Sequence, residues 1–154
     1  IKVDGVHIGQ TDMEPQEARA LLGEDAIVGL SAETESLVKL INELPSGCID
    51  YIGAGPLHVS TTKPEASVGG NDGSGHTLDE EQINAICAAS EFPVVVGGVH
   101  ADDMEMLARS KAAGWFVVSA IAGADDPEAA TREMVTRWKA VRGDAKHGYA
   151  PRVK

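Results

Sequence analysis

Short apolar runs alternate with longer segments of helical period, and this alternation limits the fold more than any other feature of the sequence. Each apolar run is followed by a segment whose apolar residues recur at helical spacing. The expected strands are residues 3–8, 26–30, 48–54, 93–96 and 115–120. The expected helices are residues 15–22, 34–44, 78–90 and 102–113, and a last helix that begins at Pro127. This order predicts an α/β fold with a parallel sheet and right-handed crossovers.

Local signals add detail to this outline. The nearly continuous apolar strands predict burial on both faces of the sheet. Thr11 or Asp12 is available to cap the first helix, and Asp126 followed by Pro127 marks the start of the last one. The expected buried stripe of the last helix is Met134, Val135, Trp138 and Val141.

The composition excludes several classes of protein. The chain has 154 residues, 43% of them hydrophobic, and a formal net charge of -11. This length suits about one domain, which we expect over residues 1–142. Acidic residues in excess, without a Lys/Arg cluster, disfavour nucleic-acid binding. No apolar run approaches the roughly 18 residues of a membrane span, and residues 1–10 lack the pattern of a secretory signal.

Cysteine usage and two polar segments complete the outline. Cys48 and Cys87 lie far apart in mainly apolar contexts, which indicates reduced thiols and a cytoplasmic location. Residues 61–78 are rich in Gly, Ser, Asp and Asn, which predicts either a mobile loop over the mouth of the sheet or a tolerated surface insertion. Residues 143–154 are polar and are expected to be a linker or a frayed terminus.

Residues that follow the strands are the candidates for a functional site, because ligands of parallel α/β sheets bind beyond the carboxyl ends of the strands. Asp12 follows the first apolar run and could hold Mg²⁺ together with water and substrate phosphate, or could only cap the next helix. Ser31 follows the second run and could contact a ligand or merely start a turn.

Three further strand ends carry groups suited to phosphate. Residues 60–63 (Ser-Thr-Thr-Lys) form either an anion site or a polar loop, because hydroxyls and an ammonium group bind oxygen anions. Gly97 and Gly98 follow the fourth run, where the absence of side chains lets an anion approach backbone amides. Ser119 and Gly123 follow the fifth run, so two successive strand ends carry small residues, as in the phosphate sites of (β/α)8 barrels.

The histidines and cysteines suggest no further chemistry. The five histidines show no metal-ligand spacing such as HxxxH or HxH. His7 alternates with apolar neighbours, which favours a buried, hydrogen-bonded residue over a catalytic one. Neither cysteine has an acid–base partner nearby in the sequence, so a Ser-His-Asp hydrolase is unsupported.

Six segments resemble, in order, motifs of the thiamine phosphate synthase family. Residues 4–12 (DGVHIGQTD) resemble the family's DGVHxGQxD segment, and residues 29–32 (GLSA) its GxSxH-T region. Residues 50–56 (DYIGAGP) resemble its DYxGxGP strand, and residues 60–64 (STTKP) are similar to its P-T-x-T-K-x loop. Gly97-Gly98 resembles its double-glycine turn, and residues 117–121 (VVSAI) its final strand. The order and approximate spacing agree over residues 2–140.

The resemblance implies a TIM (β/α)8 barrel and a transferase. Such an enzyme joins 4-amino-2-methyl-5-hydroxymethylpyrimidine diphosphate to thiazole phosphate, releases pyrophosphate and forms thiamine phosphate. The implied cofactor is Mg²⁺, held by Asp12. Ser31 and Lys63 are the implied catalytic residues at the pyrimidine diphosphate, where Mg²⁺ and Lys63 would stabilise charge on the departing pyrophosphate. The residues implied to hold the thiazole phosphate are Ser60, Thr61, Thr62, Gly98, Val118 and Ser119.

The chain supplies five of the eight strands of such a barrel, beginning at what would be the fourth. A five-stranded arc has two open edges, so we expect a homo-oligomer or part of a longer chain. Because the other strands of the barrel are absent, we expect these 154 residues alone to have little or no activity. Two alternatives remain: a thiazole tautomerase of the same fold and a non-catalytic phosphate-binding fragment. Glu33 stands where the tautomerase is expected to have its catalytic histidine, which together with Lys63 favours the synthase.

Overall fold

The computed structural model describes residues 3–59 and 77–143, which form one parallel sheet with helices along one side. The sheet has five strands in the order β1-β2-β3-β4-β5, so each strand pairs with the next one in the sequence. The predicted α/β fold with a parallel sheet is therefore confirmed. The strands are β1 (Gly5–Ile8), β2 (Ile27–Ser31), β3 (Tyr51–Ala54), β4 (Val94–Val96) and β5 (Gly114–Trp115).

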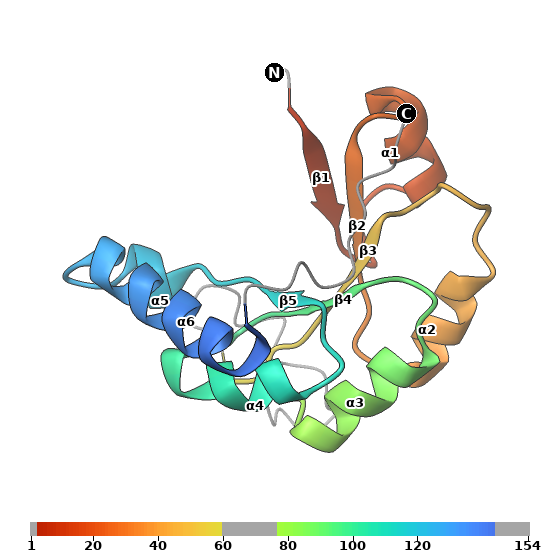
Figure 1. Ribbon diagram of the computed structural model, residues 1–154. Helices are drawn as coiled ribbons and strands as arrows, with labels where there is room; N and C mark the ends of the chain where they lie inside the picture. The colour runs from red at the N-terminus through yellow and green to blue at the C-terminus, as the bar shows by residue number, and fades with distance from the viewer. Residues whose placement is uncertain (1–2, 60–76, 144–154) are drawn as a thin grey trace.

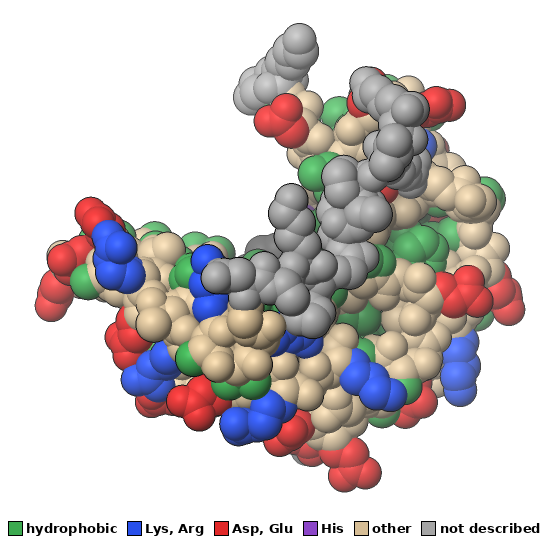
Figure 2. All heavy atoms as spheres, viewed as in Figure 1, with side chains coloured by type: hydrophobic (Ala, Val, Ile, Leu, Met, Phe, Trp, Pro, Cys, Tyr) green, Lys and Arg blue, Asp and Glu red, His purple; other side chains and the backbone are tan. Residues whose placement is uncertain are grey.

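A helix follows each strand, and α1, α2, α3, α4 and α6 follow the outer, convex side of the curved sheet (Figure 1). Acidic and basic side chains are mixed over these outer helices in the space-filling view (Figure 2). The helices are α1 (Pro15–Leu22), α2 (Glu35–Asn42), α3 (Glu80–Ala89), the 3-10 helix η2 (Ala101–Asp103), α4 (Met104–Arg109), α5 (Ser119–Ala122) and α6 (Pro127–Arg142).

The capping residues in the sequence predict the start of one helix correctly and of another wrongly. The Asp126 side chain accepts a hydrogen bond from the Ala129 backbone and Pro127 begins α6, as predicted. The prediction for α1 is wrong: its N-cap is Glu14, which makes no side-chain capping bond, and neither Thr11 nor Asp12 holds that position. Pro15 begins this helix because its fixed φ and missing N–H suit the first turn.

The hydrophobic core lies between the sheet and the outer helices. Val28, Ile52 and Val96 come from three neighbouring strands, and each is fully buried. Leu107 and Met134 meet this layer from α4 and α6, and they are 0% and 1% exposed. The buried stripe predicted for α6 is confirmed only in part. Met134 is buried, but Val141, which the helical period placed in the same stripe, remains 40% exposed.

The opposite, concave face of the sheet is not covered in the same way by the described residues. His7 is exposed and Phe116 is 45% exposed on this side, so the prediction of burial on both faces is wrong here. Glycines make room for rings that lie across this face. A Cβ on Gly29 would lie 2.2 Å from the Tyr51 ring, and a Cβ on Gly97 would lie 2.2 Å from the Phe116 ring.

The fifth strand is shorter than the apolar run that marks it. Its last pair with β4 is Val96 with Trp115, and Ser119 already lies in α5. The predicted strand over residues 115–120 is therefore wrong beyond Trp115. The Phe116 N–H still donates to the Val96 carbonyl at 3.0 Å, but residues 116–118 form no further strand pair in the described sheet, although two of them are valines.

A buried ion pair joins α1 to the start of β3. Nη2 of Arg19 lies 2.6 Å from Oδ2 of Asp50, and the two side chains are only 13% and 6% exposed. The same Asp50 oxygen accepts a hydrogen bond from the Val28 backbone at 2.8 Å. Nη1 of Arg19 donates to the carbonyls of Gly23 and Ala26 at the helix end. This network anchors the DYIGAGP segment to the outer layer.

Two predicted features fall on residues whose structure is not described. The loop predicted over residues 61–78 lies outside the described residues except at 77 and 78, and the tail predicted over residues 143–154 does so except at Gly143. None of the described helices is both long and apolar enough to cross a membrane.

Candidate functional site

A cavity of about 290 Å³ lies at the carboxyl ends of the strands. The strands are parallel, so the residues that follow them meet at one edge of the sheet, as the sequence argument requires. Ser31, Gly98, Val118 and Ser119 all line this cavity. The structure thus brings together four of the residues singled out in the sequence.

Ser31 belongs to a chain of hydrogen bonds across three strands. Its hydroxyl lies 3.0 Å from Nε2 of His7, and Nδ1 of the same ring lies 3.0 Å from the Tyr51 hydroxyl. Burial raises the pKa of the Tyr51 phenol, so its proton is retained and can be donated to Nδ1. In that tautomer Nε2–H donates to the Ser31 oxygen, and the Ser31 proton is free to point toward a ligand.

His7 and Tyr51 are residues of this site that the sequence argument missed. His7 was expected to be buried, but it is exposed and lines the cavity. Its ring lies over Gly53, where a Cβ would be only 2.6 Å from Cε1 of His7. The alternation of residues along β1 was a usable signal, because it places His7 opposite Gly29 on the concave face.

Gly98 brings the backbone close to the neighbouring strand end. Its φ of +66° lies in the left-handed region that favours glycine. A Cβ there would be 2.6 Å from Cβ of Pro56 and 3.0 Å from the carbonyl oxygen of His58. His58 N–H also donates to the Gly98 carbonyl at 2.9 Å. The loops that follow β3 and β4 are therefore held against each other.

Val118 and Ser119 approach the cavity from the last strand end. Val118 is 59% exposed, and Ser119 is exposed at the first position of α5. Because the chain leaves the sheet after Trp115, these residues belong to the turn into α5 and not to a strand. Their side chains and backbone are accessible from the cavity that they line.

Asp12 lies apart from this cavity, in a smaller one of about 170 Å³ that it lines with Gly9 and Gln10. Its Oδ2 accepts a hydrogen bond from the Gly9 backbone at 2.7 Å, which closes the turn after β1. Nε2 of Gln10 donates to the backbone carbonyl of Ser31. The Asp12 turn is thus tied to Ser31 through the intervening glutamine.

The remaining predicted site residues lie outside the described residues, so the structure does not place them: Ser60, Thr61, Thr62 and Lys63.

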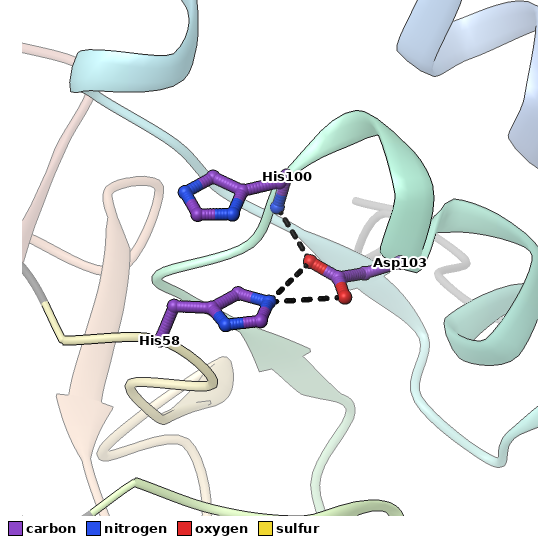
Figure 3. A group of neighbouring side chains, drawn as sticks. All are labelled: His58, His100 and Asp103. Carbon is purple, nitrogen blue, oxygen red and sulfur yellow. Dashed lines mark hydrogen bonds and ion pairs between the residues drawn. The ribbon is translucent and has the colours of Figure 1, made fainter.

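Two histidines and an aspartate meet at the edge of the cavity, which the sequence argument missed. His58 and His100 both line the cavity, and Asp103 contacts His58 (Figure 3). The two histidines show no HxxxH spacing because they come from different loops. The signal that could have found them is that His58 and His100 follow two neighbouring strands, β3 and β4.

Comparison with known proteins agrees with the motifs at this edge of the sheet. The family model described as thiamine monophosphate synthase matches residues 1–121. This chain belongs to the thiamine monophosphate synthase family. A thiamine-phosphate synthase of Corynebacterium jeikeium is 42% identical over 137 residues, which cover 88% of this chain and 59% of that relative.

Other members of the family give the same result. The thiamine biosynthesis bifunctional protein ThiM/ThiE of Symbiobacterium thermophilum is 33% identical over 145 residues, covering 94% of this chain and 28% of that protein. The solved structure of thiamine phosphate pyrophosphorylase from Pyrococcus furiosus matches with a TM-score of 0.69 and 27% identity. This match covers 91% of our chain and 61% of the solved one. The chain spans about three fifths of the length of these synthases.

Proposed function

We propose that the protein to which this chain belongs is a thiamine phosphate synthase. It would join hydroxymethylpyrimidine diphosphate to thiazole phosphate, with release of pyrophosphate and formation of thiamine phosphate. The observation that carries the proposal is the cavity shared by Ser31, Gly98, Val118 and Ser119 in a chain of this family. The family resemblance assigns the first of these residues to the pyrimidine diphosphate and the other three to the thiazole phosphate.

We propose further that residues 1–142 are the last five βα units of a (β/α)8 barrel. The sequential strand order and the helices along the convex side support this, because both are features of a barrel wall. In the described sheet β1 and β5 are edge strands, which need a partner. Further units of a longer chain, or a second copy in a homo-oligomer, would provide it.

Ser31 would donate a hydrogen bond to an oxygen of the pyrimidine diphosphate. With Nδ1 of His7 accepting from the Tyr51 hydroxyl and Nε2–H donating to the Ser31 oxygen, the Ser31 hydroxyl proton can be donated to a ligand. The His7 ring is hydrogen-bonded to Tyr51 at one nitrogen and to Ser31 at the other, which fixes the direction of the Ser31 oxygen. Lys63 would provide the positive charge, and Ser60, Thr61 and Thr62 would bind the thiazole phosphate.

Asp12 would hold Mg²⁺, and its surroundings fit a single-carboxylate ligand. The side chain is exposed, and only Oδ2 accepts a hydrogen bond among the described residues. Mg²⁺ binds well to one or two carboxylates with water and phosphate oxygens as the other ligands. When bound, the ion would neutralise charge on the diphosphate oxygens. The Gly9 N–H would keep the carboxylate directed.

The partners proposed here are small molecules, and the proposed location is the cytoplasm. Neither Cys48 nor Cys87 is in a disulfide, which supports a reducing compartment.

The proposal is tested by thiamine phosphate formation in the intact protein, with Mg²⁺ and both substrates. We expect turnover in the wild type and losses of about 100-fold or more in Lys63→Ala and Asp12→Ala, because both remove charge stabilisation from the leaving group. Ser36→Ala, which removes an exposed hydroxyl from α2, serves as the control and should leave turnover unchanged. Unchanged turnover in both charge variants would refute the proposal, as would tautomerisation of the thiazole without coupling. Residues 1–154 alone should show little or no turnover.

A further inference from the structure

His58, His100 and Asp103 form a compact group at the edge of the cavity. His58 lies in the loop after β3, His100 in the turn after β4, and Asp103 ends η2. One ligand atom from each residue lies within 4.8 Å of the other two. The two imidazoles lie beside each other, and the Asp103 carboxylate points toward the His58 ring (Figure 3).

Backbone contacts fix the two loops that carry these side chains before any ligand arrives. His58 N–H donates to the Gly98 carbonyl at 2.9 Å, which fixes the loop that carries the first imidazole. The Asp103 carboxylate accepts from the His100 backbone N–H at 2.7 Å, which fixes the turn that carries the second. Nε2 of His58 lies 3.0 and 2.9 Å from the two carboxylate oxygens.

An ion pair accounts for only part of this arrangement. It explains why His58 faces Asp103, but it gives no role to the second imidazole. The rings of His58 and His100 are stacked with centroids 4.5 Å apart and an angle of 11° between their planes. Two protonated imidazoles at this distance would repel each other, whereas two neutral imidazoles and a carboxylate are a common ligand set for a metal ion.

We propose that His58, His100 and Asp103 bind a divalent transition-metal ion, with Zn²⁺ as the best match. Zn²⁺ accepts two imidazoles and one carboxylate with water or substrate in the fourth position. Mg²⁺ is a poor match, because it prefers oxygen ligands. The fourth position would face the cavity, since His58 and His100 line it, and it would take water or an anionic oxygen.

The ligand atoms need only a small movement to reach the metal. Bonds of about 2.0–2.1 Å in tetrahedral geometry place ligand atoms about 3.4 Å apart. The nitrogen of His58 and the oxygens of Asp103 are already closer than this, and the 4.8 Å limit leaves roughly 1.4 Å for the third ligand. His100 is exposed, so its ring is free to turn by this amount. The metal binds the lone pair of Nε2 in the neutral His58 tautomer that carries its proton on Nδ1, so no net proton is lost from this imidazole.

The site does not depend on the proposed function. The Mg²⁺ expected at Asp12 belongs to a different cavity, and none of the three ligands here was assigned to either substrate. A failed synthase assay would therefore leave this proposal standing, and a failed metal-binding assay would leave the synthase standing.

Equilibrium dialysis of the untagged, intact, metal-free protein against Zn²⁺ tests the proposal. We expect one Zn²⁺ per chain, bound with a dissociation constant below the micromolar range and not displaced by millimolar Mg²⁺. His100→Ala and His58→Ala should weaken binding by about 100-fold or more, because loss of even an outer-shell partner costs about 10–100-fold. Asp102→Asn is the matched control: this neighbouring carboxylate is 90% exposed and pairs with Arg137 outside the group.

A second readout separates ligation from folding. Co²⁺ at the same site should give the visible absorption of a tetrahedral ion, and this absorption should disappear in His100→Ala. Because the His100 side chain is exposed, the circular dichroism spectrum of this variant should remain native. No saturable Zn²⁺ binding, displacement by Mg²⁺, or equal affinity in the wild type and His100→Ala would overturn the proposal.

Discussion

Replacing Arg19 by methionine should destabilise the protein strongly, although Arg19 is remote from the cavity. Its guanidinium pairs with Asp50 at 2.6 Å and donates to carbonyls at the end of α1. Methionine keeps much of the side-chain volume but removes the charge and the donors. Asp50, which is 6% exposed, then loses the guanidinium, while the Val28 N–H still donates to its Oδ2.

The expected loss follows from this burial. Removing one partner of a buried ion pair costs about 3–5 kcal/mol, because it leaves an uncompensated charge. Arg19 is 13% exposed, so solvent screening reduces this value little. For a chain of this size each kcal/mol lowers the Tm by about 2–4 °C, which gives a decrease of roughly 6–20 °C.

Urea unfolding of the intact protein, followed by circular dichroism, measures the loss. The control is Arg132→Met, which removes the ion pair with Glu128 on the surface of α6, where the side chains are 71% and 80% exposed. That change should cost at most about 1 kcal/mol. Asp50→Asn added to Arg19→Met should recover part of the loss, since it removes the buried charge that has lost its Arg19 partner. If Arg19→Met costs no more than Arg132→Met, the buried ion pair does not anchor β3 as described.

Three further changes test other parts of the structure. Gly53→Ala places a Cβ 2.6 Å from the His7 ring and should break the hydrogen bond between His7 and Ser31. Loss of about 1 kcal/mol would raise the KM for the pyrimidine diphosphate about fivefold. The control is Gly114→Ala, whose Cβ meets Val95 at 3.6 Å, and an equal KM in both variants contradicts the role of His7. Asp126→Ala removes the cap of α6 and should lower the free energy of unfolding by about 0.5–2 kcal/mol in urea titrations, whereas Asp125→Ala should have little effect. Burial raises the pKa of the Cys87 thiol to about 11 from 9.0. The stability that the neutral thiol contributes is therefore present below pH 9 and is lost as the pH rises toward 11. The Tm of the wild type should fall over this pH range relative to the Tm of Cys87→Ser, and identical pH profiles of Tm would count against it.

The strands could be predicted because parallel strands carry apolar residues with little interruption. Residues 48–54 contain all of β3, and residues 93–96 contain all of β4. The run over residues 115–120 was misleading, because Val117 and Val118 are apolar although the chain has already left the sheet. A run of apolar residues indicates which part of the chain is buried, but it does not indicate where strand pairing ends.

The candidate site could be predicted only at the level of strand ends. Ser31 and Gly98 were found because each directly follows a strand, and the fold brings all strand ends to one edge. His7 was expected to be buried and hydrogen-bonded because it alternates with apolar neighbours; it is hydrogen-bonded but exposed, because the face it lies on is open in the described residues. His58 and His100 were not grouped, because their contact depends on the loops after β3 and β4 meeting at Gly98.

The central claim is that this edge of the sheet belongs to an enzyme that couples two phosphorylated heterocycles. Its most direct test is pyrophosphate release by the intact protein, given the pyrimidine diphosphate and Mg²⁺ with and without thiazole phosphate. We predict stoichiometric release of pyrophosphate with thiamine phosphate when both substrates are present. No coupled product with both substrates, in a protein that is folded, would contradict the account.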